Sequence, residues 1–201
     1  MEKLLFATGN EAKVNRFKER LRKEKIELLS LKDIDVKIDV EENGKNAAEN
    51  AYIKAKAYYD LTGIPTIAMD DNLFLDNVPE KFQPGVFVRR VNGKRLDDSQ
   101  MISHYSGLAK KYGENGKLRA RWAYAICLIK DGKENIYTYN NDDFYIVDKP
   151  SKVITKGYPL DSVSKGLDLK CYFSEVTKKE DIKDTDSGAV KFIVENLKRD
   201  L

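Results

Sequence analysis

The stretch Leu4–Leu21, LLFATGNEAKVNRFKERL, predicts how the fold begins. Its first residues form a short apolar run that ends at TGN (residues 8–10), which is typical of a buried strand followed by a turn. In the remainder, Val14, Phe17 and Leu21 recur at i, i+3 and i+7 and mark one face of a helix. A strand that leads through a glycine-containing turn into a helix is a common first unit of an α/β fold.

The same signals continue along the chain. They predict strands at 26–31 and 66–69, helices at 47–61 and 99–111, and a final helix from Asp186 or Ser187 that buries Val190, Ile193 or Val194, and Leu197. Between these helices, RARWAYAICLIK (119–130) alternates with a period of two, DGKEN (131–135) is a hairpin turn, and IYTY and FYIV form the return. We therefore expect an α/β fold with a mixed sheet, one lobe α/β and the other more antiparallel.

Composition excludes several classes of protein. The 201 residues hold 36 Lys plus Arg against 33 Asp plus Glu, a net charge of +3, which argues against a strongly basic surface that coats a nucleic acid. No apolar run approaches the roughly 18 residues of a membrane span, and the N-terminal run is too short for a signal peptide, so we expect a cytoplasmic protein. Two cysteines and one histidine, His104, argue against a disulfide framework, a His-rich metal site and a Ser-His-Asp triad.

The first candidate site is the turn itself. Thr8, Gly9 and Asn10 precede a helix whose first turn carries Lys13. Backbone N–H groups at a helix start favour an anion, and glycine lets a ligand approach the backbone, so the turn has the layout of a phosphate cradle without a Walker sequence. The other interpretation is an ordinary strand–helix turn with Asn10 as the helix cap.

The second candidate is the segment from Glu42 into the helix at 47–61. Asn50 and Lys54 are four residues apart and share one helix face, while Glu42 precedes the helix in a glycine-containing loop. A carboxylate, an amide and an ammonium that converge can serve a metal–triphosphate. A solvated helix face is the other interpretation.

The third candidate is the pair Asp70-Asp71 after the apolar run TIAM. We expect the pair at the carboxyl end of a strand, where ligands bind in open α/β sheets. Adjacent carboxylates repel unless a cation lies between them or one is protonated, and magnesium needs only one or two carboxylates because it keeps several waters. A turn rich in Asp and Asn is the other interpretation.

Four segments in this order resemble the inosine triphosphate pyrophosphatase family of house-cleaning nucleotidases. They are ATGNEAKVNRFKERL (7–21), ENGKNAAENAYIKAKA (42–57), GIPTIAMDDNLFLDNV (63–78) and PGVFVRR (84–90). The resemblance covers the first half of the chain closely, and the strand at 119–130 continues it. It implies an elongated mixed sheet flanked by helices, two lobes with a central cleft within a single domain spanning 1–201, and a homodimer.

The resemblance also implies a reaction and roles for the candidate residues. The family hydrolyses purine nucleoside triphosphates with damaged bases, such as those of inosine and xanthosine, to the monophosphate and pyrophosphate. Carried over to this chain, Glu42 and Asp71 hold Mg²⁺, and Asp71, Asp70 and Lys54 are catalytic. The residues expected to bind substrate are Thr8, Gly9, Asn10, Lys13, Asn50, Arg90 and Tyr158. Magnesium and the two lysines neutralise the triphosphate, and a carboxylate near the metal orients the water.

The C-terminal half departs from the family pattern. The family's FGYDP is replaced by KGYPLD (156–161), and its Ser-His-Arg-Gly before the last helix by TDSG (185–188). A family lysine is absent unless Lys179 or Lys183 replaces it. Because these family segments grip the purine base, we expect a magnesium-dependent pyrophosphatase with altered base selectivity.

Other interpretations stay open. The same losses suit a catalytically weak or inactive relative that binds a nucleotide. Tyr158, Trp122 and Phe144 either stack on a base or pack in the core. The aromatic residues of the hairpin half either leave an apolar surface for a second copy or pack internally; they are Tyr137, Tyr139, Phe144 and Tyr145.

Overall fold

The computed structural model describes residues 1–36, 38–168, 171–176 and 186–198. The chain divides into two compact units. The first contains Met1–Asp71, Tyr124–Tyr139 and Thr185–Leu201, and the second contains Asn72–Ala123 and Asn140–Asp184. Lys179, Lys183 and Thr185, which the sequence brought into consideration, lie outside the described residues.

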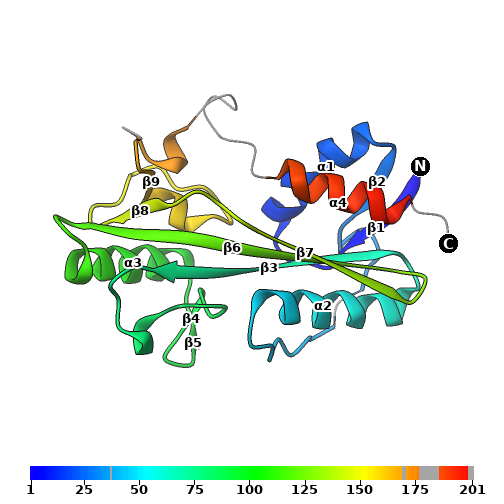
Figure 1. The fold of residues 1–201 in the computed structure, drawn as a ribbon, viewed down its shortest axis with the longest axis horizontal. Coiled ribbons are helices and arrows are strands. Elements are labelled where there is room, and N and C mark those ends of the chain that lie inside the picture. Colours follow the sequence, from blue (N-terminus) through cyan, green and yellow to red (C-terminus); the bar gives the residue numbers. More distant parts are fainter. Residues whose placement is uncertain (37, 169–170, 177–185, 199–201) are drawn as a thin grey trace. The chain divides into compact units, whose positions relative to one another are not determined.

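The first unit has helices on both sides of a sheet in which β1, β2 and β3 are parallel. Its elements are β1 (Glu2–Phe6), α1 (Glu11–Lys23), β2 (Ile26–Leu29), α2 (Ala47–Thr62), the start of β3 (Thr66–Leu75), the end of β6 (Lys117–Lys130), most of β7 (Lys133–Asn140) and α4 (Ser187–Leu197). β1 pairs in parallel with both β2 and β3. Figure 1 shows α1 and α4 on one side of these strands and α2 on the other.

Small residues bring α2 close to the strands. Ala47, Ala51 and Ala55 recur every fourth residue and are almost fully buried, in one apolar cluster with Leu5, Ala68 and Cys127 of the sheet. Because alanine has a short side chain, the helix backbone lies near the sheet, and polar side chains beside the alanine stripe reach the strand. This packing brings Asn50 and Lys54 close to the sheet.

The second unit packs a helix and short elements against antiparallel strands. Its elements are the end of β3, η1 (Glu80–Phe82), β4 (Arg90–Val91), β5 (Lys94–Arg95), α3 (Asp98–Tyr112), the start of β6, β8 (Phe144–Val147), η2 (Pro159–Ser162), β9 (Ser164–Gly166) and η3 (Phe173–Glu175). β8 pairs antiparallel with both β6 and β9. The core of this unit includes Tyr105, Leu118, Phe144 and Ile146.

Seven of the described strands form a mixed sheet, in the order β2-β1-β3-β6-β8-β9 with β7 beside β6, and β4 and β5 pair with each other in a separate two-stranded sheet. The β6–β7 turn is made at Asp131 and Gly132, both with positive φ, as a tight hairpin requires. A mixed sheet flanked by helices was predicted from the sequence and is confirmed. Among the described residues, no helix is long and apolar enough to cross a membrane.

Two expectations about elements are wrong in detail. The strand predicted at 66–69 continues to Leu75, so Asp70 and Asp71 lie inside β3. The last helix buries Ala189 with Ile193 and Leu197, while Val190 is only partly buried. In both cases the apolar pattern located the element, and packing decided its length or the face that it buries.

Candidate functional site

Strand β3 places its two aspartates on opposite faces of the sheet. Side chains alternate along a strand, so Asp70 and Asp71 point to different sides. On the α1 side, the Lys13 Nζ donates to both carboxylate oxygens of Asp71, at 3.0 and 2.9 Å. The side chains of both residues are mostly buried, with 15% and 22% exposed. This pair joins the first turn of α1 to β3.

The α2 side holds a second group around Asp70. Asn50 is 2% exposed, accepts a hydrogen bond from the Gly44 N–H at 2.8 Å, and hydrogen-bonds to Asp70. Lys54 acts electrostatically on Asp70 and forms an ion pair with Glu42 at 3.2 Å. One lysine and two carboxylates therefore lie on this side, and one lysine and one carboxylate on the other. With every group ionised, these five residues carry a formal charge of 2 − 3 = −1.

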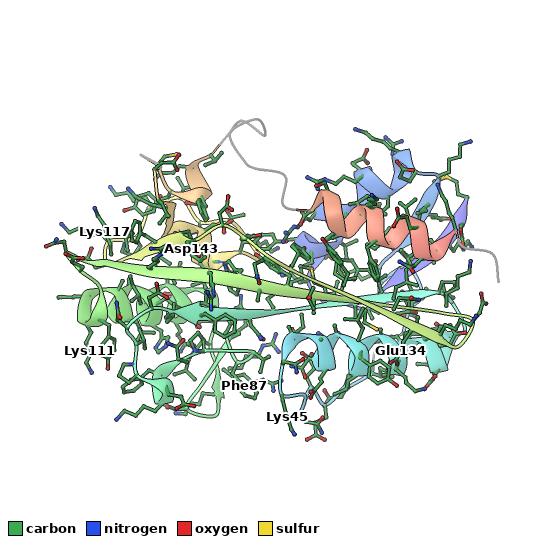
Figure 2. The ribbon with its side chains drawn as sticks, viewed as in Figure 1. Lys45, Phe87, Lys111, Lys117, Glu134 and Asp143 are labelled. Carbon is green, nitrogen blue, oxygen red and sulfur yellow. The ribbon has the colours of Figure 1, made fainter. Side chains whose placement is uncertain are left out.

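Lys45, although it follows Glu42 in the same loop, does not belong to this group. Its side chain is exposed and is labelled in Figure 2, where it points away from α2. The cation that serves the α2 side is therefore Lys54.

The Asp70 carboxyl is held in an unfavourable environment. Burial raises its pKa above the ordinary value and the charge of Asp71 adds to this, while Lys54, Lys13 and the hydrogen bond from Asn50 act against it. Its Oδ2 is buried and has no hydrogen-bond partner among the described residues. A buried acceptor without a partner costs free energy, and a bound cation or donor would remove that cost.

These contacts decide between the interpretations left open for two segments. The interpretation of residues 70–72 as an Asp-rich turn is wrong, because these residues lie in β3. The expectation that the pair ends the strand is also wrong, because β3 continues to Leu75. The solvated helix face is wrong because Asn50 is buried and the Lys54 side chain is 14% exposed. The structure thus brings together Glu42, Asn50, Lys54 and Asp70, and separately Lys13 and Asp71.

The turn between β1 and α1 is an ordinary capped helix start that leaves open space. The Asn10 side chain accepts from Ala12 N–H at 3.0 Å, and the Thr8 hydroxyl accepts from Asn10 N–H at 3.2 Å. A Cβ added to Gly9 would meet no protein atom within 4 Å, so the protein's own packing does not require glycine there. The cap interpretation is confirmed, and it leaves space above the backbone for a ligand.

The oxygen atoms present suit a magnesium ion that keeps water ligands. Within the described ranges, no three His, Cys, Asp or Glu side chains gather as a ready ligand set. Mg²⁺ is usually held by one or two carboxylates together with waters and substrate phosphates. The unpartnered Oδ2 of Asp70, on the α2 side with Glu42, fits that mode of binding.

Sequence reasoning missed a second charged group, which lies near Tyr124. Arg16 lies one helical turn beyond Lys13 and donates to both carboxylate oxygens of Asp186, through Nε at 2.6 Å and through a second guanidinium nitrogen. Tyr139 also donates to Asp186, at 3.2 Å, and the Arg16 guanidinium lies 5.4 Å from the Tyr124 ring centre. The i, i+3 spacing of Lys13 and Arg16 was the available signal, but nothing local identifies a partner 170 residues away.

The remaining predicted residues belong to the second unit. Arg90 is exposed in β4, and Tyr158 is half-buried just before η2, where its N–H donates to the Thr155 carbonyl at 3.0 Å. Phe144 is 2% exposed, and Trp122 stacks on it with ring centres 6.5 Å apart. Core packing is therefore confirmed for Phe144, and no role in binding is tested for Arg90 or Tyr158.

Three of the four aromatic residues of the hairpin half, Tyr137, Tyr139 and Phe144, pack internally. Tyr139 stacks on Tyr124, and Tyr137 stacks on both Tyr139 and Phe192. These rings, with the buried Phe144, are therefore engaged within the chain.

Solved structures of similar fold share this architecture. A HAM1 protein from Coxiella burnetii superimposes with a TM-score of 0.77 at 24% identity, covering 98% of each chain. The Staphylococcus aureus Ham1 protein gives 0.68 at 23% identity, covering 89% of this chain and 88% of that one. These likenesses concern the fold.

Relatives are also found by sequence. A Bacillus licheniformis protein named dITP/XTP pyrophosphatase is 32% identical over 167 residues, 81% of each chain. A Christiangramia forsetii protein of the same name is 30% identical over 198 residues, 98% of this chain and all of that one. The model of the Ham1 family matches residues 4–181. Since that match spans most of the sequence, the chain belongs to the Ham1 family.

Proposed function

We propose that this chain hydrolyses purine nucleoside triphosphates with altered bases, such as dITP and XTP, to the monophosphate and pyrophosphate. The observation that carries the proposal is the group around β3, where two aspartates are flanked by one lysine from α1 and one from α2. Family membership and the names of the relatives support the same reaction.

Each lysine of the free site is paired with a carboxylate that a metal would occupy. Lys13 is bonded to Asp71 and Lys54 to Glu42. Mg²⁺ bound at Glu42 would free the Lys54 ammonium group, and Mg²⁺ bound at Asp71 would free that of Lys13, so each ammonium group would become available to the phosphates. The same residues thus satisfy one another in the free protein and serve a metal–triphosphate in the bound state. The open turn at Thr8, Gly9 and Asn10 offers backbone N–H groups to a phosphate.

The carboxylates suit hydrolysis at the α-phosphorus. Bound Mg²⁺ supplies charge neutralisation on the phosphates. A water oxygen forms a bond to the α-phosphorus, the bond from that phosphorus to the α–β bridging oxygen breaks, and pyrophosphate leaves with the bond's electrons. The proton of the water passes to a carboxylate of the pair Asp70 and Asp71. Asn50 and Lys54 orient Asp70 for this work.

The proposal extends to organisation, selectivity and assembly. We propose a single domain of two lobes that acts in the cytoplasm as a homodimer. We also propose that Arg90 and Tyr158 contact the substrate and that the base selectivity is altered. The loss of the family's Ser-His-Arg segment supports altered selectivity, because buried groups that pair with a base edge account for strong discrimination. Exposed apolar side chains such as Phe87, labelled in Figure 2 and 49% exposed, support a partner surface.

Pyrophosphate release tests the proposal directly. We would assay dITP, inosine and xanthosine triphosphates and the standard ribo- and deoxyribonucleoside triphosphates with and without Mg²⁺. Asp71→Asn is the test variant, and Glu19→Gln, which breaks an exposed ion pair with Arg22 on the outer face of α1, is the control. We expect metal-dependent release that Asp71→Asn abolishes and Glu19→Gln preserves. Binding of Mg²⁺ and nucleotide without release would establish the inactive relative instead.

A further inference from the structure

Asp186 is placed where an aspartate ordinarily caps a helix, yet its side chain makes no capping bond. It occupies the N-cap position of α4, and its side chain makes no capping hydrogen bond to the described residues of that helix. An aspartate that caps a helix contributes about 1 kcal/mol to its stability. The carboxylate instead binds Arg16 and Tyr139, with Arg20 at 3.6 Å, and the residue is 5% exposed.

Arg16 stays charged and binds this carboxylate strongly. Burial alone would lower the pKa of its guanidinium, but the hydrogen bond and charge of Asp186 raise it, so the group stays charged. A paired guanidinium and carboxylate that share two hydrogen bonds form a directional contact. If the carboxylate lost its charge, a half-buried cation would be left without its partner, which is costly.

Asp71 is the carboxylate that binds the neighbouring cation on α1, Lys13. Arg16 and Lys13 are three residues apart on α1, so their side chains leave the helix on the same face. Tyr124 is near both groups: burial and the charge of Asp71 raise the pKa of its hydroxyl, Arg16 acts against this, and the Arg16 guanidinium lies over its ring. An arginine prefers a carboxylate that it can grip with two hydrogen bonds, so a released Arg16 would compete with Lys13 for Asp71.

We propose that Asp186 is a positioning residue that holds Arg16 away from Asp71, so that Asp71 stays available to Lys13 and to a metal ion. The inference rests on the proposed function only where it assigns a metal to Asp71. Asp186 belongs to TDSG (185–188), the segment before the last helix that departs from the family pattern. Through Arg16, this segment would act on Lys13 and Asp71.

The proposal predicts that a second substitution repairs the damage of the first. In Asp186→Asn, the freed Arg16 moves toward Asp71, and Mg²⁺ affinity falls by at least about tenfold, equivalent to 1.4 kcal/mol. In Arg16→Gln/Asp186→Asn the competing cation is gone, and Mg²⁺ affinity returns to within about threefold of wild type. Glu19→Gln, on the same helix, changes neither value. Isothermal titration calorimetry with Mg²⁺ and no nucleotide measures these affinities.

A second measurement is independent of metal binding and turnover. The Lys13 amine, bonded to Asp71, should react slowly with an acylating reagent, and mass spectrometry gives the rate for each lysine. We expect faster labelling of Lys13 in Asp186→Asn and the wild-type rate in the double variant. If wild type binds no Mg²⁺, the metal assignment of the proposed function fails, and the labelling still decides this inference. An unchanged Lys13 rate in Asp186→Asn, or a double variant as impaired as the single one, overturns it.

Discussion

Asp70 and Asp71 are neighbours in sequence but stand in different surroundings. Asp71 is bonded to Lys13 on the α1 side, whereas Asp70 faces Asn50 and Lys54 on the α2 side. Burial raises the pKa of Asp70 and leaves its Oδ2 without a partner in the described part of the chain. Asp70 is therefore a residue that weakens the metal-free fold, as polar groups at functional sites often do.

Replacing Asp70 should stabilise the metal-free protein while it removes activity. Because the folded state raises this pKa, the favourable contribution exists below the ordinary value of 3.8 and is lost as pH rises through the folded value. At neutral pH, Asp70→Asn should raise Tm by about 2–4 °C, the shift that about 1 kcal/mol gives in a protein of this size. Thermal unfolding measures it.

Two controls check the cause of that shift. The difference in Tm between wild type and Asp70→Asn should shrink as the pH is lowered, because wild-type Asp70 then becomes neutral as well. Added Mg²⁺ should raise the Tm of wild type more than that of the variant. A variant that is less stable than wild type at neutral pH would contradict the explanation.

Among the elements, the loop before α2 depends on a glycine. A Cβ added to Gly44 would lie 2.7 Å from Asn50 Oδ1 and 2.7 Å from Glu49 Cβ, which is closer than side chains pack. The Gly44 N–H also donates to Asn50, so the loop and the helix start hold each other. This glycine allows the loop that carries Glu42 to pass close to Asn50.

Alanine at two glycines should therefore have opposite effects. Gly44→Ala should displace Asn50, destabilise the protein by about 1–3 kcal/mol and lower pyrophosphate release at least tenfold. Gly107, in the interior of α3, has no atom within 4 Å of an added Cβ, so Gly107→Ala should stabilise the protein by about 0.5–1 kcal/mol with unchanged activity. Urea unfolding and the release assay compare the two. Equal stability of the two variants would show that the contact at Gly44 is unimportant.

On the scale of the whole molecule, the charged residues of the candidate site lie in one of the two units. Lys13, Glu42, Lys54, Asp70 and Asp71 all belong to the first unit, although they come from four separate segments of the chain. A ligand without a base, such as magnesium pyrophosphate, should therefore bind to that unit.

Hydrogen exchange with mass spectrometry tests this assignment. Magnesium pyrophosphate at 100 times its Kd stabilises the binding-competent fold by about 2.7 kcal/mol. We expect slower exchange at residues 8–13, 42–54 and 66–71, and no change in α3 of the second unit. Asp71→Asn is the control and should show no protection. Protection confined to the second unit would place the phosphate site elsewhere.

The sequence alone determined the elements and the family resemblance. Apolar patterning located α1, α2, α3 and the strands β1, β2, β3, β6, β7 and β8, because which side chains are buried follows from a pattern within a few residues; the short strands β4, β5 and β9 were not predicted. The Glu42–Lys54 segment and the aspartate pair were recognised from their order and residue types, and these residues were found close together. Elements and motifs of this kind can be predicted because they depend on residues that are close together in the sequence.

Only the tertiary structure decided how the charges are paired. The extent of β3 determined that Asp70 and Asp71 face opposite sides, since pairing in the sheet continues a strand that its apolar residues only begin. The partner of Arg16 is 170 residues away, and no local pattern specifies it. Contacts between distant segments depend on how whole elements pack, and for that reason the electrostatics of this site could not be predicted from the sequence.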